Sequence, residues 1–316
     1  MTARSGDLLG AGLVVLAAAC FGTLGPMSEF ADDAGVSSLS LVTWRAGLGA
    51  TLVGLFLAAR LATGGGRYTP LRTLPVTERW FVVGASVANA VLNLAVFVAF
   101  LRIGIAMALL IFYLYPGFVA LVSVLWFGER LDRTRWAALA IALGGMVLVV
   151  AGQGELGSLD VLGLSLALVG AVAQTFYVLA ARHGFARVPA AEAAATTMAI
   201  AAVIYVAAAV LLGQAAALAQ PLDGLEALWP VVVAGLIGAG IPTLAFISGI
   251  RLLGAPRAAI LAMFEPVVGV ALAALLLAQE PTQLQLAGGA LIIAAGIVLQ
   301  RRPRADVVEH EAVPLN

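Results

Sequence analysis

The sequence has no lysine, one cysteine and two histidines, and only 11% of its 316 residues carry a charge. The 17 basic residues, all arginines, balance 17 acidic ones, so no net positive field favours nucleic acid as a partner. The single cysteine, Cys20, cannot form an intrachain disulfide or a thiolate cluster for a metal. His183 and His310 lie in hydrophilic stretches and offer little to a catalytic triad or an HExxH zinc site. We expect neither a metal nor a cofactor.

Apolar residues make up 62% of the chain. Roughly a quarter of an ordinary soluble chain is charged, so this composition predicts an integral membrane protein. No GxxxxGK[ST] run is present, so any transport must draw on a gradient rather than on nucleotide hydrolysis. The segment before Cys20 resembles a lipoprotein signal, but Asp7 offsets Arg4 in its charged region. We therefore expect Cys20 to lie inside a first membrane helix.

Long apolar runs recur along the chain, and a hydrocarbon core about 30 Å thick requires around 20 apolar residues per helix. We predict an all-α membrane protein with ten transmembrane helices, at residues 8–29, 38–60, 79–101, 105–127, 134–152, 160–181, 190–212, 228–250, 256–277 and 284–301. If the N-terminus is cytoplasmic, the outer loops contain Arg102 and no other arginine. This positive-inside bias predicts a multi-pass protein of the bacterial cytoplasmic membrane with both termini in the cytoplasm.

The two halves of the chain resemble each other. The segment RIGIAMALLIFYLYPGF aligns without a gap with LLGAPRAAILAMFEPVV, which places Gly104 on Gly254 and Pro116 on Pro266. An odd number of helices per half would insert the second half upside down, as in the inverted repeats of secondary transporters. We expect two five-helix repeats and a polar cytoplasmic tail, at residues 1–152, 160–302 and 303–316.

The order of these elements resembles a known family. The pattern PGFVALVSVLWFGERL, followed by a Gly-Gly pair and echoed by EPVVGVALAALLLAQEP, is similar to the EamA domain of the drug/metabolite transporter superfamily. The resemblance implies a ten-helix carrier that exports an amino acid, another metabolite or a drug. Arg45 resembles an arginine that those proteins often carry in their second helix. The chain departs from the family in its first helix, where AAACFG replaces a frequent tryptophan.

Glu265 is an acid in the middle of an apolar run, and Pro266 follows it directly. An ionised acid at mid-helix costs roughly 2.5–3.5 kcal/mol on insertion scales, and proline removes a backbone donor. If the helix starts near Pro256, Glu265 lies about 13 Å along it, close to the midplane. This combination favours a polar cavity, where Glu265 would bind a substrate amine or carry a proton. The alternative is a structural acid that fixes helix packing.

Tyr115 and Arg45 are further candidates for this cavity. The repeat maps Tyr115 onto Glu265, on the opposite wall, where its hydroxyl and ring suit an amine or an apolar group. Tyr113 lies two positions away, so on a helix it is expected to point elsewhere. Arg45 lies about two turns into the second helix. It either extends outward to the headgroups or reaches Glu265 as a counter-ion.

Polar side chains also recur in the third and sixth predicted helices. Ser86, Asn89 and Asn93 share one helical face, which favours a pore-lining stripe over hydrogen bonds between helices. Gln174 and Tyr177 are weaker candidates of the same kind.

These features together predict a secondary transporter with a central cavity that opens alternately to each side. Its expected partners are a small metabolite, such as an amino acid-like compound or a drug, the lipid bilayer and protons. Pro116, Pro266 and Pro242 would be hinges or static kinks. Export follows from the resemblance alone, and uptake or facilitated diffusion stay open. A membrane-embedded enzyme would need clustered surface Asp, His or Cys, and a receptor predicts no polar lining at mid-membrane.

Overall fold

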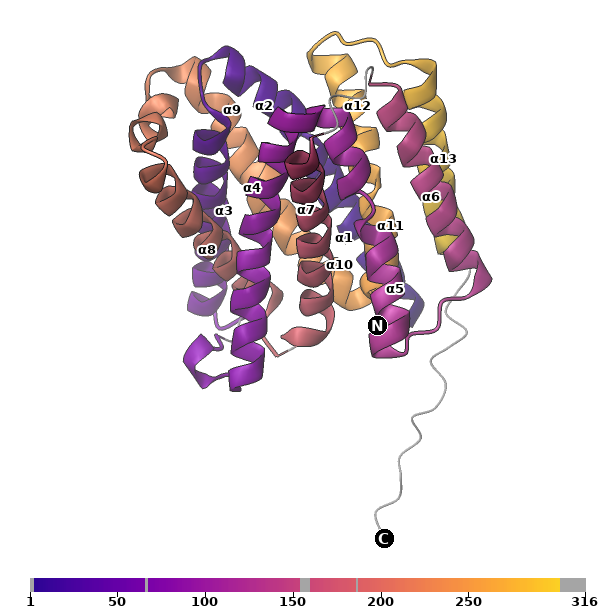
Figure 1. Ribbon diagram of the computed structural model, residues 1–316. Coiled ribbons are helices and arrows are strands. Elements are labelled where there is room, and N and C mark those ends of the chain that lie inside the picture. The colour runs from indigo at the N-terminus through magenta and orange to yellow at the C-terminus, as the bar shows by residue number, and fades with distance from the viewer. Residues whose placement is uncertain (1–2, 66–67, 154–159, 186, 302–316) are drawn as a thin grey trace.

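The chain folds into a bundle of helices (Figure 1). A computed structural model describes residues 3–65, 68–153, 160–185 and 187–301, and within them every regular element is a helix. The first half contains α1 (Ala3–Gly22), α2 (Leu24–Asp33), α3 (Ser38–Ala62), η1 (Leu71–Thr73), α4 (Val76–Phe112), α5 (Tyr115–Phe127) and α6 (Arg133–Ala151). The second half contains α7 (Val161–Leu179), η2 (Ala180–Gly184), α8 (Ala190–Leu211), η3 (Ala215–Leu222), α9 (Leu225–Gly235), η4 (Leu236–Gly240), α10 (Ile241–Leu253), α11 (Ala255–Ala262), α12 (Phe264–Leu276) and α13 (Gln283–Arg301).

Several helices begin at a side-chain cap. Ser37, Asp132 and Asp160 each accept a hydrogen bond from the backbone amide three residues later, at the starts of α3, α6 and α7. Such caps satisfy donors that the first helical turn leaves free. The hydrogen bond from the Gly163 amide also lowers the pKa of Asp160, because it favours the charged carboxylate. These local signals fix where the membrane helices start.

Nine helical segments of the described residues are long and apolar enough to cross a membrane. One of them, Val76–Phe127, contains 52 residues. At 1.5 Å per residue it would be about 78 Å long, more than twice the thickness of the hydrocarbon core. Its helix is interrupted at Gly104, and Figure 1 shows the chain turning back at the upper end of α4 toward α5. This run contains the two spans that the sequence predicts at 79–101 and 105–127.

The same backbone break occurs in both halves. Gly104 (φ 76°, ψ 159°) and Gly254 (φ 87°, ψ 158°) adopt nearly the same conformation, which residues with a side chain rarely adopt. Further along, one turn separates α4 from α5 and another separates α11 from α12. Each turn lies just before a proline, Pro116 or Pro266, which cannot donate the backbone bond that would continue the helix.

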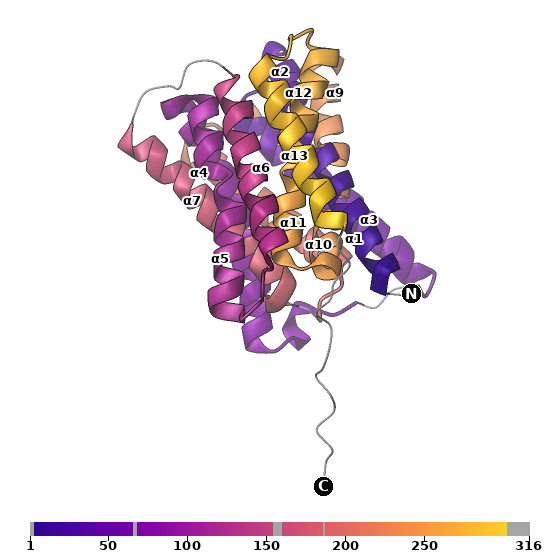
Figure 2. The same ribbon diagram turned by 90° about the vertical axis from the view of Figure 1, so that its right-hand side faces the viewer.

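The helix contacts repeat between the halves in the same way. The most extensive contacts pair α4 with α7, α6 with α13, α1 with α10 and α3 with α8. If each helix is replaced by its equivalent in the other half, the α4–α7 pair becomes the α10–α1 pair. The α3–α8 and α6–α13 pairs each map onto themselves. In Figures 1 and 2, α1 runs upward from the lower end of the bundle, whereas α7 runs downward from the upper end.

The α6–α13 contact depends on a pair of glycines, which gives a first prediction. A Cβ atom at Gly145 would lie 2.7 Å from the Gly288 carbonyl oxygen, whereas one at Gly144 would have nothing within 4 Å. We expect Gly145→Ala to lower the free energy of unfolding by about 1–3 kcal/mol, because the two helices must separate. Gly144→Ala should leave the free energy of unfolding unchanged or raise it slightly. Thermal unfolding of the purified protein in detergent compares the two, and equal midpoints would contradict this account of the contact.

Candidate functional site

Glu265 lies in the first turn of α12, next to two other parts of the bundle. The Tyr113 hydroxyl, just after the C-terminal end of α4, lies beside its carboxylate. Its backbone carbonyl packs against α1, where a Cβ atom added at Gly22 would lie 2.9 Å away. The residue remains partly accessible to solvent. The acid therefore lies inside the bundle rather than on its lipid-facing surface.

Arg45, on α3, is only 9% exposed and points into the same region. Its Nη2 atom donates to the Asn93 side-chain oxygen at 2.8 Å, and the Asn93 amide donates to the Asn89 carbonyl at 2.8 Å. Arg45 therefore does not extend to the headgroups. Its charge interacts with that of Glu265, but no nitrogen–oxygen distance within 4 Å joins them in the described chain. Two opposite charges therefore lie near each other without a direct ion pair.

Aromatic side chains complete this cluster. The rings of Tyr113 and Tyr115 lie 6.2 Å apart, and the Tyr115 side chain lies beside Gln174 of α7. Tyr205 of α8 is buried beside Arg45 and Asn93. The expectation that Tyr113 points elsewhere is wrong, because the helix turns between the two tyrosines and brings both rings to one side.

Three other candidates lie outside the cluster. Ser86 is fully buried, and its hydroxyl donates to the Val82 carbonyl at 2.7 Å and lies 3.3 Å from the Thr197 hydroxyl. It therefore packs α4 against α8 instead of lining an accessible space. Tyr177 is 2% exposed and interacts with Arg251 near the lower end of α10. Pro242 is the second residue of α10, which follows the π-helical turn η4 directly, and no contact joins it to the charged pair in the described chain.

The cluster is closed toward the lower end of the bundle. Every residue of α11 except Arg257 is buried, whereas no residue of α12 above it is (Figure 1). At the lower end of α10, Arg251 donates to the carbonyls of Val188 at 2.6 Å and Phe185 at 3.3 Å, which ties α10 to the loop before α8. Glu265 lies at the boundary between the buried helix α11 and the partly exposed helix α12.

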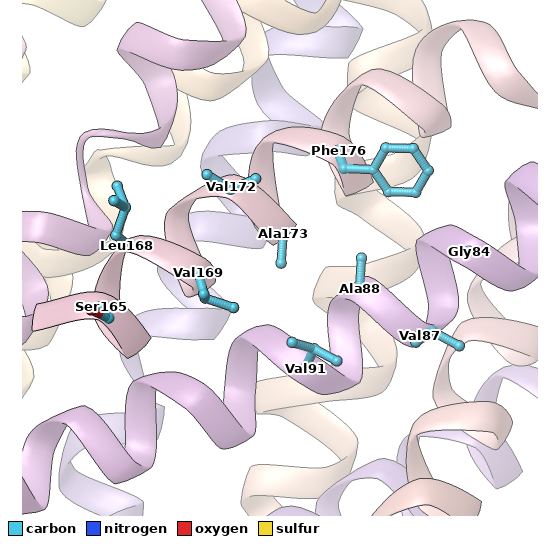
Figure 3. A pocket seen from close by; sticks show the side chains of 10 residues that line it. All are labelled: Gly84, Val87, Ala88, Val91, Ser165, Leu168, Val169, Val172, Ala173 and Phe176. Carbon is cyan, nitrogen blue, oxygen red and sulfur yellow. The ribbon is translucent and has the colours of Figure 1, made fainter. Parts of the chain in front are cut away.

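An apolar groove of about 560 Å³ lies elsewhere, between α4 and α7. Figure 3 shows Ala88 and Val91 of α4 facing Val169 and Ala173 of α7. Charged side chains are absent from its lining, and its walls belong to membrane-spanning segments, so lipid chains are its natural contact.

We place the candidate functional site at the polar cluster, since only polar groups can orient a polar solute. Among the described residues, no three His, Cys, Asp or Glu side chains gather as a metal would require.

Comparison with known proteins agrees with this architecture. A crystal structure of a protein with 23% sequence identity superposes on 94% of this chain and 98% of its own, with a TM-score of 0.74, which shows a shared fold. No curated protein is similar enough in sequence to count as a match. The EamA-like transporter family matches residues 8–151 and again residues 161–300, two copies that cover nearly the whole chain. The chain belongs to the EamA-like transporter family.

Proposed function

We propose that the protein is a secondary transporter that exports a small zwitterionic metabolite across the bacterial cytoplasmic membrane. One observation carries the proposal: the opposite charges of Arg45 and Glu265 lie near enough to interact, and no ion pair within 4 Å joins them in the described chain. Two charges held in a membrane protein are costly unless each is paired. A ligand with a carboxylate and an ammonium group satisfies both, with the carboxylate on Arg45 and the ammonium on Glu265.

The remaining residues of the cluster suit the rest of such a ligand. Asn93 and Tyr205 fix the Arg45 guanidinium, and Tyr113 holds the Glu265 carboxylate. The rings of Tyr113 and Tyr115, with Gln174 at their edge, offer an apolar surface with polar tips. This chemistry favours an amino acid-like compound over a sugar, which lacks charges, and over a simple amine, which would leave Arg45 unpaired.

The proposed topology has ten crossings, with the run at Val76–Phe127 crossing twice. Residues 1–152 and 160–302 then form two inverted repeats, consistent with the opposite directions of α1 and α7. The expected cytoplasmic tail, residues 303–316, lies outside the described residues. Arg60, Arg130 and Arg182 belong to the lower end, and Arg102 to the upper end, so the positive-inside rule puts the lower end in the cytoplasm.

Alternating access follows from this arrangement. The burial of α11 and the lack of buried residues in α12 support a proposed state that is closed to the cytoplasm and open to the outside. The breaks before Pro116 and Pro266, and the π-helical turn before Pro242, are the proposed joints at which the halves move. Protons are the proposed coupling ion, with Glu265 alternately binding a proton and the ammonium group of the substrate.

A thermal-shift screen of the purified protein tests the substrate class. A zwitterionic amino acid at about 100 times its Kd should stabilise the folded state by about 2.7 kcal/mol. The matching amine and the matching carboxylic acid, each with one charge removed, should stabilise it far less. A shift that is equal for the zwitterion and the amine, or that appears only with sugars, would contradict the proposal. Uptake of the best ligand into inside-out proteoliposomes then measures export directly.

A further inference from the structure

A second cavity, of about 520 Å³, lies at the lower end of the bundle between α1, α3, α8 and α10. Its walls are mostly apolar, with Leu13 from α1, Phe56 from α3, and Leu244 and Ala245 from α10. Arg60 is the charged residue of its lining. A concave, largely apolar cavity with one convergent charge has the form of a small-molecule site, and this volume is within the usual range.

The Arg60 guanidinium keeps its charge available at the mouth of this cavity. It donates to the Gly65 carbonyl and lies 5.9 Å from the centre of the Phe56 ring. Neither contact neutralises the charge, and no carboxylate of the described residues lies within 4 Å of Arg60. The cavity therefore combines an uncompensated positive charge with an apolar interior.

Arg60 and Arg45 lie on the same face of α3. Gly49, Phe56 and Arg60 follow Arg45 by four, eleven and fifteen residues, spacings that return to one side of an α-helix. At 1.5 Å per residue, the two arginines are about 22 Å apart along the helix axis. A path along this face would lead from the lower cavity to the charged pair, and Gly49 lies on it.

Gly49 forms the barrier between the two places. A Cβ atom added there would lie 3.1 Å from the Gly240 amide nitrogen and 3.1 Å from the Met198 sulfur. The α3 backbone thus contacts the end of η4, a π-helical turn followed by Pro242. Such turns are frequent where a helix rearranges, and proline leaves the neighbouring backbone bond unmade.

We propose that the lower cavity is a cytoplasmic entrance subsite for a zwitterionic substrate with an apolar side chain, where Arg60 binds the substrate carboxylate, and that the Gly49–Gly240 contact closes the path from it to Arg45. This inference rests on the proposed function and adds to it a first site for the substrate, the class of ligand that this site takes, and the place where the cytoplasmic gate closes.

Thiol labelling tests the subsite without any need for transport. In a Cys20→Ser background, Ser248→Cys places a thiol on the cavity wall, and Leu55→Cys places one beside Phe56 that is 65% exposed on the outer face of α3. A charged, membrane-impermeant thiol reagent should label Ser248→Cys from the cytoplasmic side and should not label Leu55→Cys, which faces lipid. Hexanoate should slow labelling of Ser248→Cys, and hexylamine should not. Arg60→Gln should weaken the protection by hexanoate about tenfold or more, because it removes a charged hydrogen-bond donor.

The labelling results separate the alternatives. An unreactive Ser248→Cys would mean that lipid fills the cavity, and protection by hexylamine as strong as that by hexanoate would remove the role of Arg60. Either result overturns the inference. Neither affects the proposed function, which depends on binding of a zwitterion between Arg45 and Glu265.

Access to the charged pair tests the barrier. In the same background, Asn93→Cys should react with the reagent from the outer side only. Adding Gly49→Val should also make it reactive from the cytoplasmic side, because the new side chain forces α3 and η4 apart.

Gly54→Val is the matched control on α3, where a Cβ atom meets nothing within 4 Å, and it should not change access. Gly49→Ala, a milder change, should give a smaller increase if the valine variant does not fold. Cytoplasmic reactivity that is unchanged in Gly49→Val or Gly49→Ala, or equally raised in Gly54→Val, would overturn the barrier.

Discussion

Glu265→Gln is expected to weaken binding of a zwitterionic substrate about 10- to 100-fold. The neutral amide replaces the carboxylate, so the hydrogen bond between two charged groups, Glu265 and the substrate ammonium, is lost. The change keeps the shape of the side chain and its contact with Tyr113, so the fold should persist. Isothermal titration of the purified variant with the ligand from the thermal-shift screen measures the loss. Glu280→Gln is the control, because that acid is exposed and lies between α12 and α13, outside the cluster.

The same variant separates two roles for the acid. If Glu265 binds the ammonium group, Glu265→Gln should still bind a ligand that carries the carboxylate alone as well as the wild-type protein does. If Glu265 also carries the coupling proton, transport by Glu265→Gln in proteoliposomes should no longer respond to a pH gradient. Unchanged affinity for the zwitterion, together with an unchanged response to the gradient, would leave a purely structural acid and reject the proposed function.

Much of this arrangement can be read from the sequence. The Gly104–Gly254 and Pro116–Pro266 correspondences predict two matching breaks, because only glycine readily adopts those backbone angles and proline interrupts the backbone bonds of a helix. The acid before Pro266 indicates a polar interior at the same level. In the structure, this acid meets α1 and the end of α4, two elements distant from it in the sequence.

The contacts between distant helices could not be predicted in this way. The identity of the partners depends on how α3, α4, α8 and α12 pack, and the soft apolar pattern of each helix allows many rotations about its axis. Tyr205 was missed for this reason, although a lone tyrosine in the middle of an apolar helix was a usable signal. Helical spacing predicts that Tyr113 points away from Tyr115, but it does not hold across the turn between α4 and α5. Sharing a face with Asn89 and Asn93 does not place Ser86 in a cavity, because one polar face can meet both a cavity and a neighbouring helix.

Arg45→Gln should weaken binding of the zwitterion by a similar factor, about 10- to 100-fold, since it removes the partner of the carboxylate. Arg45→Lys should retain part of the affinity, because an ammonium group keeps the charge but loses the planar, two-pronged geometry of the guanidinium. The exposed Arg72 provides the control, and Arg72→Gln should bind as the wild type does. Titration with the zwitterion and with its amine distinguishes a lost carboxylate contact from general damage, because affinity for the amine should be unchanged.

The two charged residues should also act as a unit. A ligand that bridges Arg45 and Glu265 couples their contributions, so the losses in Arg45→Gln and Glu265→Gln should not add in the double variant. Exchanging the charges, with Arg45→Glu and Glu265→Arg together, restores one site for each end of the ligand and should recover part of the affinity that either single reversal removes. Additive losses, with no recovery on exchange, would mean that the two residues serve separate purposes. The space between them would then not be where the substrate binds.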